Sequence, residues 1–555
     1  MPSSAPGRSV EQARRERVPD ATRTGPPHVA VIIVTWNRRQ AVGDVIAAIS
    51  AQRFPIDRLD VVIVDNCSTD GTCEYLVRRW RPERVVENPT LSAHEPAFSM
   101  PSENGLPSKR NAAGFRSLTV VRNSHNLGGC GGFNTGFAFV ERVLDAPDRA
   151  GRPDYVWLVD DDVDLPTDAL AQLAHTAESD AGIGIVGSRA VDFYDRTTTI
   201  ESTIYFDSER GRMDDTPTMS SPRYEEHQSW LREVVATKGS GSGPFAGLRE
   251  VDVVSACSLL ARWSAVREVG FWDYRYFIYC DDADWCLRFG RHGYRVVCDL
   301  DAVVYHTPWY QKLTPARLYY SQRNIVWLIQ KTFPKWRLKY ATFRWLASIL
   351  NDCLQASFHR RIFHAEIIRR TAADIVANRG GRLEDDGPPK HDVVDGFRAI
   401  GALERDSTIV VLCAQDGAVS WADELRDAVE RGGGSACSVR WVYVVRNDVD
   451  PGDRDARGPE RVIYSSRLRS KLFRQVRFWV SPPRAVVVFN QTNDFPLLRG
   501  RFNVHVDRKW PTTVQIERDG IGPRVSFLAR WTMTCLRSLW RSASIRPYVS
   551  PHRFG

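Results

Sequence analysis

The feature that most constrains the fold is a strand, helix, strand pattern near the start of the chain. Val29–Thr35 is an apolar, β-branched run, Ala41–Gln52 has apolar residues at helical spacing, and Leu59–Val64 is a second apolar run. Two strands joined through a helix run parallel, because the chain crosses back over the sheet before the second strand begins. The pattern therefore predicts an α/β fold built on a parallel sheet.

The length of 555 residues exceeds what one hydrophobic core usually serves and predicts several units. A later α/β pattern, with strands at 408–414, 439–445 and 485–489, has no glycine-rich phosphate loop and no catalytic cluster. The predicted order is a disordered leader at 1–27, a first α/β domain at 28–310, a helical extension at 311–395, a second, smaller α/β domain at 400–510 and a basic amphipathic tail at 511–555.

The charge pattern favours a membrane surface over a nucleic acid as partner. The net charge is +8, but the basic residues of the last third lie beside Trp, Phe and Leu rather than in Lys/Arg blocks. No apolar run reaches the ~18 residues of a spanning helix, so the expected membrane contact is peripheral. Eleven cysteines without a CxxC pair indicate reduced thiols in a cytosolic protein.

The tail predicts an amphipathic helix over residues 524–546. Two interpretations stay open: a helix lying in a lipid interface, or a helix packed on the protein with its arginines in solvent. At helical spacing one face carries Phe527, Leu528, Trp531, Cys535 and Leu539, and another carries Arg530, Arg537 and Arg541.

An acidic cluster follows the apolar run that ends at Val159. Asp160, Asp161, Asp162 and Asp164 come where a strand would end and a loop begin. Carboxylates at the carboxyl end of a strand face the crevice where α/β proteins bind ligands, and they are hard ligands for a divalent cation. A turn rich in Asp would give the same pattern, so this cluster alone does not decide between the two.

Polar residues also follow the first two strands. Thr35–Arg38 closes the first, and Val64–Thr72, with the sequence VDNCSTDGT, closes the second. Such residues either hydrogen-bond a base or ribose or cap the next helix. Further along, Asn126–Gly136 carries five glycines in a predicted strand-to-helix connection, where the backbone could approach a phosphate or sugar closely.

Two later segments carry groups suited to proton transfer and metal binding. Tyr279–Arg288 places three carboxylates at the predicted N-terminus of a helix, where a general base could take a proton from a hydroxyl. The strand-like run Val303–Tyr305 ends in His306, which either completes a metal site or is a structural histidine.

Taken in order, these motifs resemble the inverting family 2 glycosyltransferases with the GT-A fold, and within them the bacterial galactofuranosyltransferases. The similarity covers roughly His28–Trp309. It implies a GT-A-type, Rossmann-like nucleotide-sugar domain. The motifs that carry it are T-x-N-R, V-D-N-x-S-x-D-G-T, N-L-G-G-x-G-G-F-x-x-G, D-D-D and D-D-A-D-W-x-L-R, closed by Tyr305 and His306.

The resemblance implies a role for each matching position. Asp282 would be the catalytic base, with Asp281, Asp284 and Trp309 orienting it or contacting the acceptor. Asp160, Asp162 and His306 would hold a divalent metal, Mn²⁺ or Mg²⁺. The implied donor-binding residues are Thr35, Arg38, Asp65, Asn66, Asn126, Gly128, Gly129, Gly131, Gly132 and Asp161.

The resulting hypothesis is a metal-dependent inverting glycosyltransferase, peripheral on the cytoplasmic face of the plasma membrane. It would move galactofuranose from UDP-galactofuranose to a hydroxyl of a lipid-linked cell-envelope glycan, and self-association stays open. The alternatives are a dTDP-rhamnosyltransferase of the same family, a non-catalytic nucleotide-sugar-binding module and a nucleotidyltransferase. The absence of a Gly/Arg/Lys-rich triphosphate loop near Thr35 counts against the nucleotidyltransferase.

Overall fold

The computed structural model forms two compact units. It describes residues 25–90, 96–99, 111–236, 246–308, 315–358, 362–383, 389–414, 417–433, 439–447, 449, 458–464, 478, 481–489, 498, 500–506 and 513–542. Unit 1 takes the described residues up to Thr342 together with Asn378–Arg382, and unit 2 takes Phe343–Ala377 and the described residues from Leu383 onward. Most of the predicted leader, and Trp309, lie outside the described residues.

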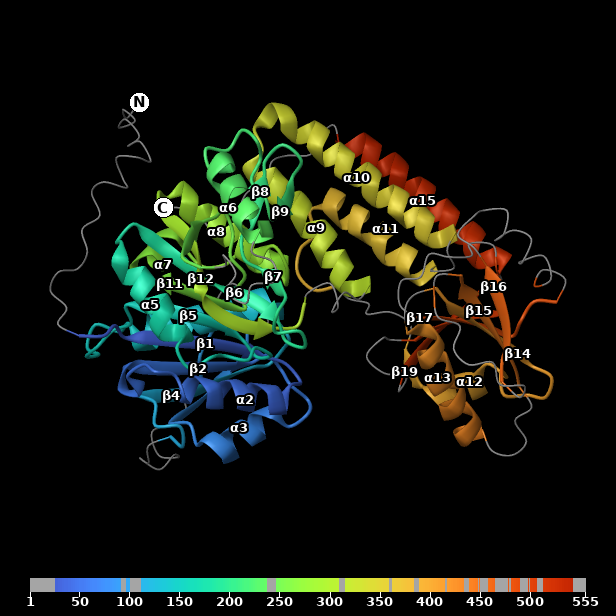
Figure 1. Ribbon diagram of the computed structural model, residues 1–555, viewed down its shortest axis with the longest axis horizontal. Helices are drawn as coiled ribbons and strands as arrows, with labels where there is room; N and C mark the ends of the chain where they lie inside the picture. Colours follow the sequence, from blue (N-terminus) through green and yellow to red (C-terminus); the bar gives the residue numbers. More distant parts are fainter. Residues whose placement is uncertain are drawn as a thin grey trace. The chain divides into compact units, whose positions relative to one another are not determined.

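Unit 1 is built on a mixed sheet that is mainly parallel (Figure 1). Its order is β10-β12-β6-β11-β5-β1-β2-β4-β3, with β7 beside β6, and β7, β10 and β11 run antiparallel to their neighbours. The strands are β1 (Val29–Thr35), β2 (Leu59–Asp65), β3 (Arg84–Asn88), β4 (Ser117–Asn123), β5 (Tyr155–Asp160), β6 (Ile183–Asp192), β7 (Thr199–Glu201), β10 (Leu248–Glu250), β11 (Ser258–Arg262) and β12 (Arg295–His306), with β8 (Tyr205–Asp207) and β9 (Arg212–Asp214) as a separate hairpin.

Helices cover both faces of this sheet, which is why β1 and β2 are apolar along almost their whole length. The odd-numbered residues of β1 pack in one core with α2, α3 and α5, and the even-numbered ones face α4. The helices of unit 1 are α2 (Arg39–Ser50), α3 (Thr72–Trp80), α4 (Gly128–Phe139), α5 (Ala169–Ser179), α6 (Tyr224–Ala236), α7 (Trp263–Val269), α8 (Asp281–Arg291) and α9 (Pro315–Thr332).

The parallel register brings three strand ends to one edge of the sheet. Thr35 pairs with Asp65, and Val34 pairs with Asp160. The predicted α/β class and the opening strand, helix, strand unit are therefore confirmed. The edge strand β3, between α3 and β4 in the chain, pairs in parallel with β4.

Unit 2 contains a second sheet in the order β13-β19-β18-β17-β14-β15-β16, parallel except at β13 and β19. The predicted strands at 408–414, 439–445 and 485–489 are present within a residue or so. Its elements are α11 (Ile362–Ala377), β13 (Lys390–Asp392), α12 (Val393–Ala399), β14 (Thr408–Cys413), α13 (Ala418–Gly433), β15 (Arg440–Arg446), β16 (Glu460–Tyr464), β17 (Ala485–Phe489), β18 (Phe502–Val506), β19 (Thr513–Arg518) and α15 (Ile521–Ser542), with α10 (Lys335–Phe358) spanning the boundary between the units.

The tail helix α15 packs on unit 2 along one face. Phe527 is fully buried, and the Trp531 indole N–H donates to the Leu350 carbonyl at 2.9 Å. The predicted apolar face is therefore divided: Phe527 and Trp531 point to the protein, whereas Leu528 and Leu539 are exposed. The reason is that two apolar arcs lie side by side on this helix, and the sequence alone does not say which one meets the protein.

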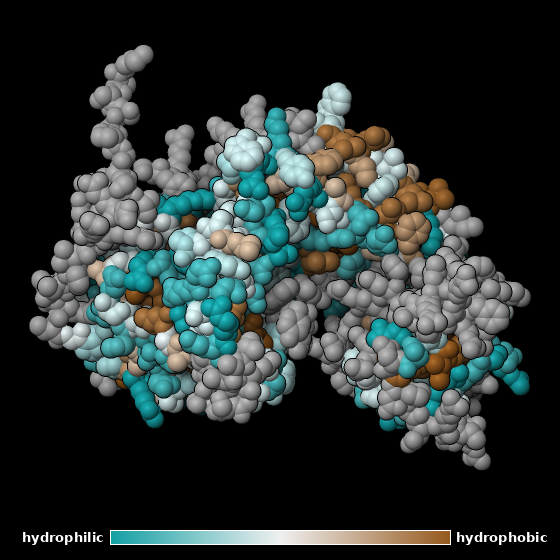
Figure 2. Space-filling view, turned by 45° about the horizontal axis from the view of Figure 1, so that its top comes forward, coloured by the Kyte–Doolittle hydropathy of each residue, from teal (hydrophilic) through white to brown (hydrophobic). Residues whose placement is uncertain are grey.

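Exposed apolar side chains form the other arc of α15. At 100° per residue they span an arc of about 140°, beside which Arg530, Arg537 and Arg541 project. Figure 2 shows apolar residues gathered over the helices at the upper right. No helix among the described residues is long and apolar enough to cross a membrane. The exposed members are Val525, Leu528, Met533, Leu536, Leu539 and Trp540.

Candidate active site

A group of three candidate metal ligands lies at the carboxyl edge of the unit 1 sheet. Asp160 ends β5, Asp162 lies in the turn after it, and His306 ends β12. His306 Nε2 is 3.3 Å from Oδ1 of Asp162 and 3.7 Å from Oδ2 of Asp160. One ligand atom from each residue lies within 4.8 Å of the other two. Two carboxylates and an imidazole suit Mn²⁺ and similar divalent ions, so this donor set fits a bound cation.

The middle aspartate of the run, Asp161, turns toward β1. Its two oxygens accept hydrogen bonds from the Thr35 hydroxyl at 2.7 Å and from Arg38 at 2.9 Å. Arg38 also pairs with Asp162 at 2.6 Å. Burial raises the pKa of Asp161 to about 6, against the opposing effect of Arg38. Asp161 thus joins the ends of β1 and β5 and fixes Arg38 beside the candidate metal ligands.

Two residues at the end of β2 differ in what they contact. Asp65 is fully buried, and one of its oxygens accepts the Ser68 N–H at 2.9 Å, while Oδ2 has no hydrogen-bond partner among the described residues. Burial raises the pKa of Asp65. Asn66 donates to the Gly128 carbonyl at 2.9 Å and to Asn126 at 3.2 Å. Asn66 therefore holds the start of α4 against the end of β2.

The glycine run begins a helix rather than forming an extended connection. Gly128 and Gly129 open α4 and line the pocket described below, with Gly128 at φ +74°. A Cβ on Gly132 would clash with Val34 of β1. Gly131 and Gly132 are buried in the helix and do not line the pocket. The later glycines thus allow close packing of α4 on the sheet, and the first two bring backbone to the pocket.

The paired acids Asp281 and Asp282 lie at the N-terminus of α8 and line the same pocket. Asp282 accepts the Ala283 N–H at 2.7 Å. Burial raises the pKa of Asp282 to about 6, and the carboxylates of Glu201 and Asp160 act in the same direction. Burial, together with the charge of Asp282, raises the pKa of Asp281. Asp282 therefore titrates in the range in which a carboxylate works well as a general base.

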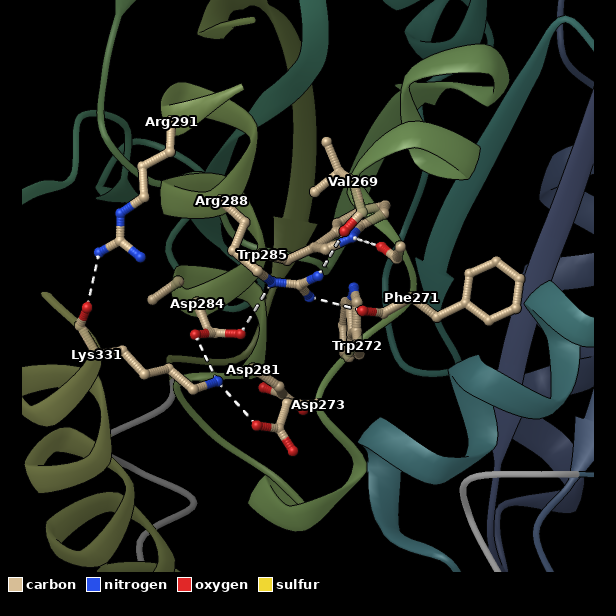
Figure 3. A network of polar contacts seen from close by, with 12 residues as sticks. Val269, Phe271, Trp272, Asp273, Asp281, Asp284, Trp285, Arg288, Arg291 and Lys331 are labelled. Atoms are coloured by element: carbon tan, nitrogen blue, oxygen red, sulfur yellow. Dashed lines mark hydrogen bonds and ion pairs between the residues drawn. The ribbon is translucent and has the colours of Figure 1, made fainter. Parts of the chain in front are cut away.

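The third acid of this motif, Asp284, points away from the pocket into a buried polar network (Figure 3). It lies 3.1 Å from Arg288 and 2.9 Å from Lys331 of α9, and Lys331 also contacts Asp273 at 2.8 Å. Burial opposes ionisation of Asp284, but Lys331 and Arg288 lower its pKa below the usual value. In this position Asp284 anchors α8 and does not reach an acceptor directly.

A pocket of about 430 Å³ lies among these segments, and Asp65, Gly131, Gly132 and Asp284 do not line it. Several of its residues were not expected from the sequence. Glu201 on β7 and Arg317 and Tyr320 on α9 each stand alone in a segment without a motif, and Tyr279 opens the acidic motif but was not assigned a role. The sequence-predicted residues that line the pocket are Thr35, Arg38, Asn66, Asn126, Gly128, Gly129, Asp160, Asp161, Asp162, Asp281, Asp282 and His306.

The segment from β1 to β3 is similar to a known family. Residues 30–89 match the family model "Glycosyl transferase family 2". This part of unit 1 therefore resembles a family 2 glycosyltransferase domain. The matched residues include Thr35, Arg38, Asp65 and Asn66. Asp160, Asp282 and His306 lie outside the matched segment, and the fold brings them to the same pocket as Thr35 and Arg38. No curated protein matches the sequence.

Solved glycosyltransferase structures are distantly similar to the chain. A mannosyltransferase, PcManGT, from Pyrobaculum calidifontis, in complex with GDP-Man and Mn²⁺, is 17% identical, with 66% of this chain and 81% of that chain covered and a TM-score of 0.34. TarS of S. aureus is 14% identical, with 63% and 50% covered and a TM-score of 0.35. GalNAc-T7 with UDP, GalNAc and Mn²⁺ is 13% identical, with 57% and 50% covered and a TM-score of 0.36. At these scores the similarities assign neither donor nor acceptor to the family 2 domain.

Binding of Mn²⁺ at Asp160, Asp162 and His306 can be measured as a change in thermal stability. An ion that binds only the folded state stabilises it by about 2.7 kcal/mol at a concentration of 100 Kd, so Mn²⁺ should raise the Tm of the wild type by a few degrees. Asp160→Ala should abolish this shift. Asp164→Asn is the matched control, because Asp164 pairs with Arg196 at 2.6 Å and is partly exposed. An equal shift in Asp160→Ala would place the ion elsewhere.

Proposed function

We propose that this protein is a metal-dependent inverting glycosyltransferase that moves a sugar from a nucleoside diphosphate donor to a hydroxyl acceptor. One observation carries the proposal: the carboxylate of Asp282 and the candidate ligands Asp160, Asp162 and His306 line one pocket with Thr35 and Arg38 of the family 2 segment. A binding module would need the nucleotide contacts but not a carboxylate suited to act as a base.

Asp282 is the proposed catalytic base. Its carboxylate takes the proton of the acceptor hydroxyl while the hydroxyl oxygen forms a bond to the anomeric carbon. The bond from that carbon to the diphosphate oxygen breaks in the same step, so the configuration at the carbon inverts. With a pKa of about 6, Asp282 is mostly ionised at neutral pH and still basic enough to accept the proton.

The start of α4 suits the donor. The Gly128 and Cys130 N–H groups are bonded to Asn126 and Phe277, so the helix end offers a diphosphate the Gly129 N–H and a partial positive charge. At the end of β2, Asn66 lines this pocket, whereas the predicted donor-binding residue Asp65 is fully buried and does not. Asp160, Asp162 and His306 would hold a divalent ion, which would supply positive charge to the leaving diphosphate.

For the donor sugar we propose galactofuranose from UDP-galactofuranose, with a lipid-linked cell-envelope glycan as acceptor. The support is the motif series from Thr35 to His306, which resembles that of the galactofuranosyltransferases. A dTDP-rhamnose donor is the alternative of the same family. The two differ in the nucleotide base and in the sugar ring, so a donor assay separates them directly.

A donor panel tests the reaction. The wild type should consume UDP-galactofuranose in the presence of Mn²⁺ and lose activity in EDTA. Asp282→Asn should lower kcat by about 10²–10⁴-fold, because an amide cannot take the proton. Asp164→Asn, in the acidic run but outside the pocket lining, should retain wild-type kcat. Consumption of dTDP-rhamnose alone would correct the sugar, and full turnover by Asp282→Asn would contradict the mechanism.

The pH profile tests the base separately. Because Asp282 must be ionised, kcat/KM should fall about tenfold per pH unit below its pKa of about 6. Burial is the main cause of that raised pKa, and Glu201 adds to it. Glu201→Gln should therefore move the acid limb to lower pH. Glu209→Gln, at an exposed carboxylate, should leave the limb in place. If Glu201→Gln does not move the acid limb of the pH profile, Asp282 is not the titrating base.

We further propose that the exposed arc of α15 contacts the cytoplasmic face of the plasma membrane peripherally. Large apolar residues, including Leu536 and Trp540, are exposed along one side of this helix. Arg537 and Arg541 lie beside them, where they can meet anionic headgroups. This arrangement combines apolar burial with attraction to negative charge, as interfacial helices do.

Vesicle binding tests this contact. Leu536→Glu should weaken co-sedimentation with phosphatidylglycerol–phosphatidylcholine vesicles by about tenfold, because burial of one Leu contributes ~1.5–3 kcal/mol. Met219→Glu makes the same change at an exposed apolar residue of unit 1 and should bind as the wild type does. Equal binding by both variants would show that α15 does not contact the lipid.

A further inference from the structure

The backbone that leads into Asp281 and Asp282 adopts conformations that non-glycine residues rarely take. Phe277, Tyr279 and Cys280 have φ values of 69°, 69° and 60°. Phe277, with ψ −55°, is close to a classic γ-turn, which is rare and strained. Strained residues of this kind persist only where their surroundings hold them, and they cluster at functional sites. The 276–280 loop therefore needs partners that fix its backbone.

Arg323 of α9 supplies one set of partners. Its side chain is fully buried, and its guanidinium donates to the carbonyls of Tyr276 at 2.8 Å and Arg275 at 3.2 Å. It also donates to the Gly381 carbonyl at 2.9 Å. The guanidinium carbon lies 4.5 Å from the centre of the Trp327 ring. The buried cation here interacts with carbonyl dipoles and an aromatic face.

Asn324, the next residue, supplies the rest. Its amide nitrogen lies 3.0, 2.7 and 2.8 Å from the carbonyl oxygens of Tyr276, Ile278 and Tyr279. Its own oxygen accepts the Arg323 Nε–H at 3.0 Å. Asn324 is fully buried. Together Arg323 and Asn324, which we call the α9 clamp, bind the carbonyls on both sides of Phe277.

The clamped loop touches both sides of the pocket. It leads directly into α8, which carries Asp282. The Phe277 carbonyl accepts the Cys130 N–H at 3.1 Å, and a Cβ on Gly128 would clash with it. The Phe277 ring stacks on Tyr320 of α9 at 4.9 Å. A shift of the loop would therefore move the proposed base relative to the N-terminus of α4.

We propose that Arg323 and Asn324 are positioning residues, which hold the strained 276–280 loop so that Asp282 faces the donor bound at the start of α4. The inference rests on the proposed function for its kinetic consequence, whereas the constraint on the loop is independent of it. Neither residue lines the pocket. Their effect on the reaction passes through the loop backbone and Asp282.

Kinetics of the full-length protein test the clamp. Asn324→Ala removes the amide nitrogen that makes all three carbonyl contacts and should lower kcat by about 100-fold, since a misplacement of ~1 Å costs that much, while the donor KM changes little. Thr332→Ala is the matched control on the same helix, because the Thr332 hydroxyl donates only within α9. It should keep the wild-type kcat.

A second substitution separates clamping from general stability. Cys280→Gly relieves the strain at φ +60°, because glycine adopts this conformation without cost. In the Asn324→Ala background it should recover about tenfold of the lost kcat. If Asn324→Ala does not fold, Arg323→Lys, which keeps the charge but loses the guanidinium fork, replaces it in both measurements.

Amide hydrogen exchange makes the test independent of the sugar. In the clamp variant, peptides covering 276–284 should exchange about tenfold faster or more, and peptides of β14 and β15 should not change. Unchanged exchange and unchanged kcat would overturn the clamp. A wild type that transfers no sugar from any donor would refute the proposed function, and the exchange data would then decide the clamp alone.

Discussion

The site depends first on the parallel register of β1, β2 and β5. Strand β1 is hydrogen-bonded to β2 on one side and to β5 on the other, so none of the three strands can shift its register alone. This register places Thr35, Asp65 and Asp160 at one edge of the sheet. Loops, helices and the strand ends of β7 and β12 add the other pocket residues to that edge.

Helix α9 holds the proposed base from two directions. Lys331 pairs with Asp284 and Asp273 and anchors the body of α8, whereas Arg323 and Asn324 bind the loop before it. Both sets of contacts are buried. Loss of one partner of a buried ion pair costs about 3–5 kcal/mol, so the position of α8 is strongly determined. Arg323, Asn324 and Lys331 of α9 thus determine where Asp282 lies, although none of the three lines the pocket.

The acidic run shows how similar residues acquire different roles through their neighbours. Asp160 and Asp162 face His306, whereas Asp161 faces Thr35 and Arg38. Asp164 pairs with Arg196 near the surface. Side chains point in alternating directions at the end of β5 and in the turn that follows, so adjacent aspartates contact different partners. On helix α8, residues two positions apart face nearly opposite sides, which separates Asp282, lining the pocket, from Asp284, anchored in the network.

The sequence by itself determined the α/β class, the first parallel unit and most of the polar residues of the pocket, because strand periodicity and strand-end residues are local signals. It also predicted the strands of unit 2 near 408, 439 and 485. Only the tertiary structure decided which glycines reach the pocket, which face of α15 is exposed, and that Glu201, Arg317 and the α9 clamp belong to the site. These features depend on packing between segments that are far apart in the chain. A single residue such as Asn324 carries no local sequence pattern that would predict such packing.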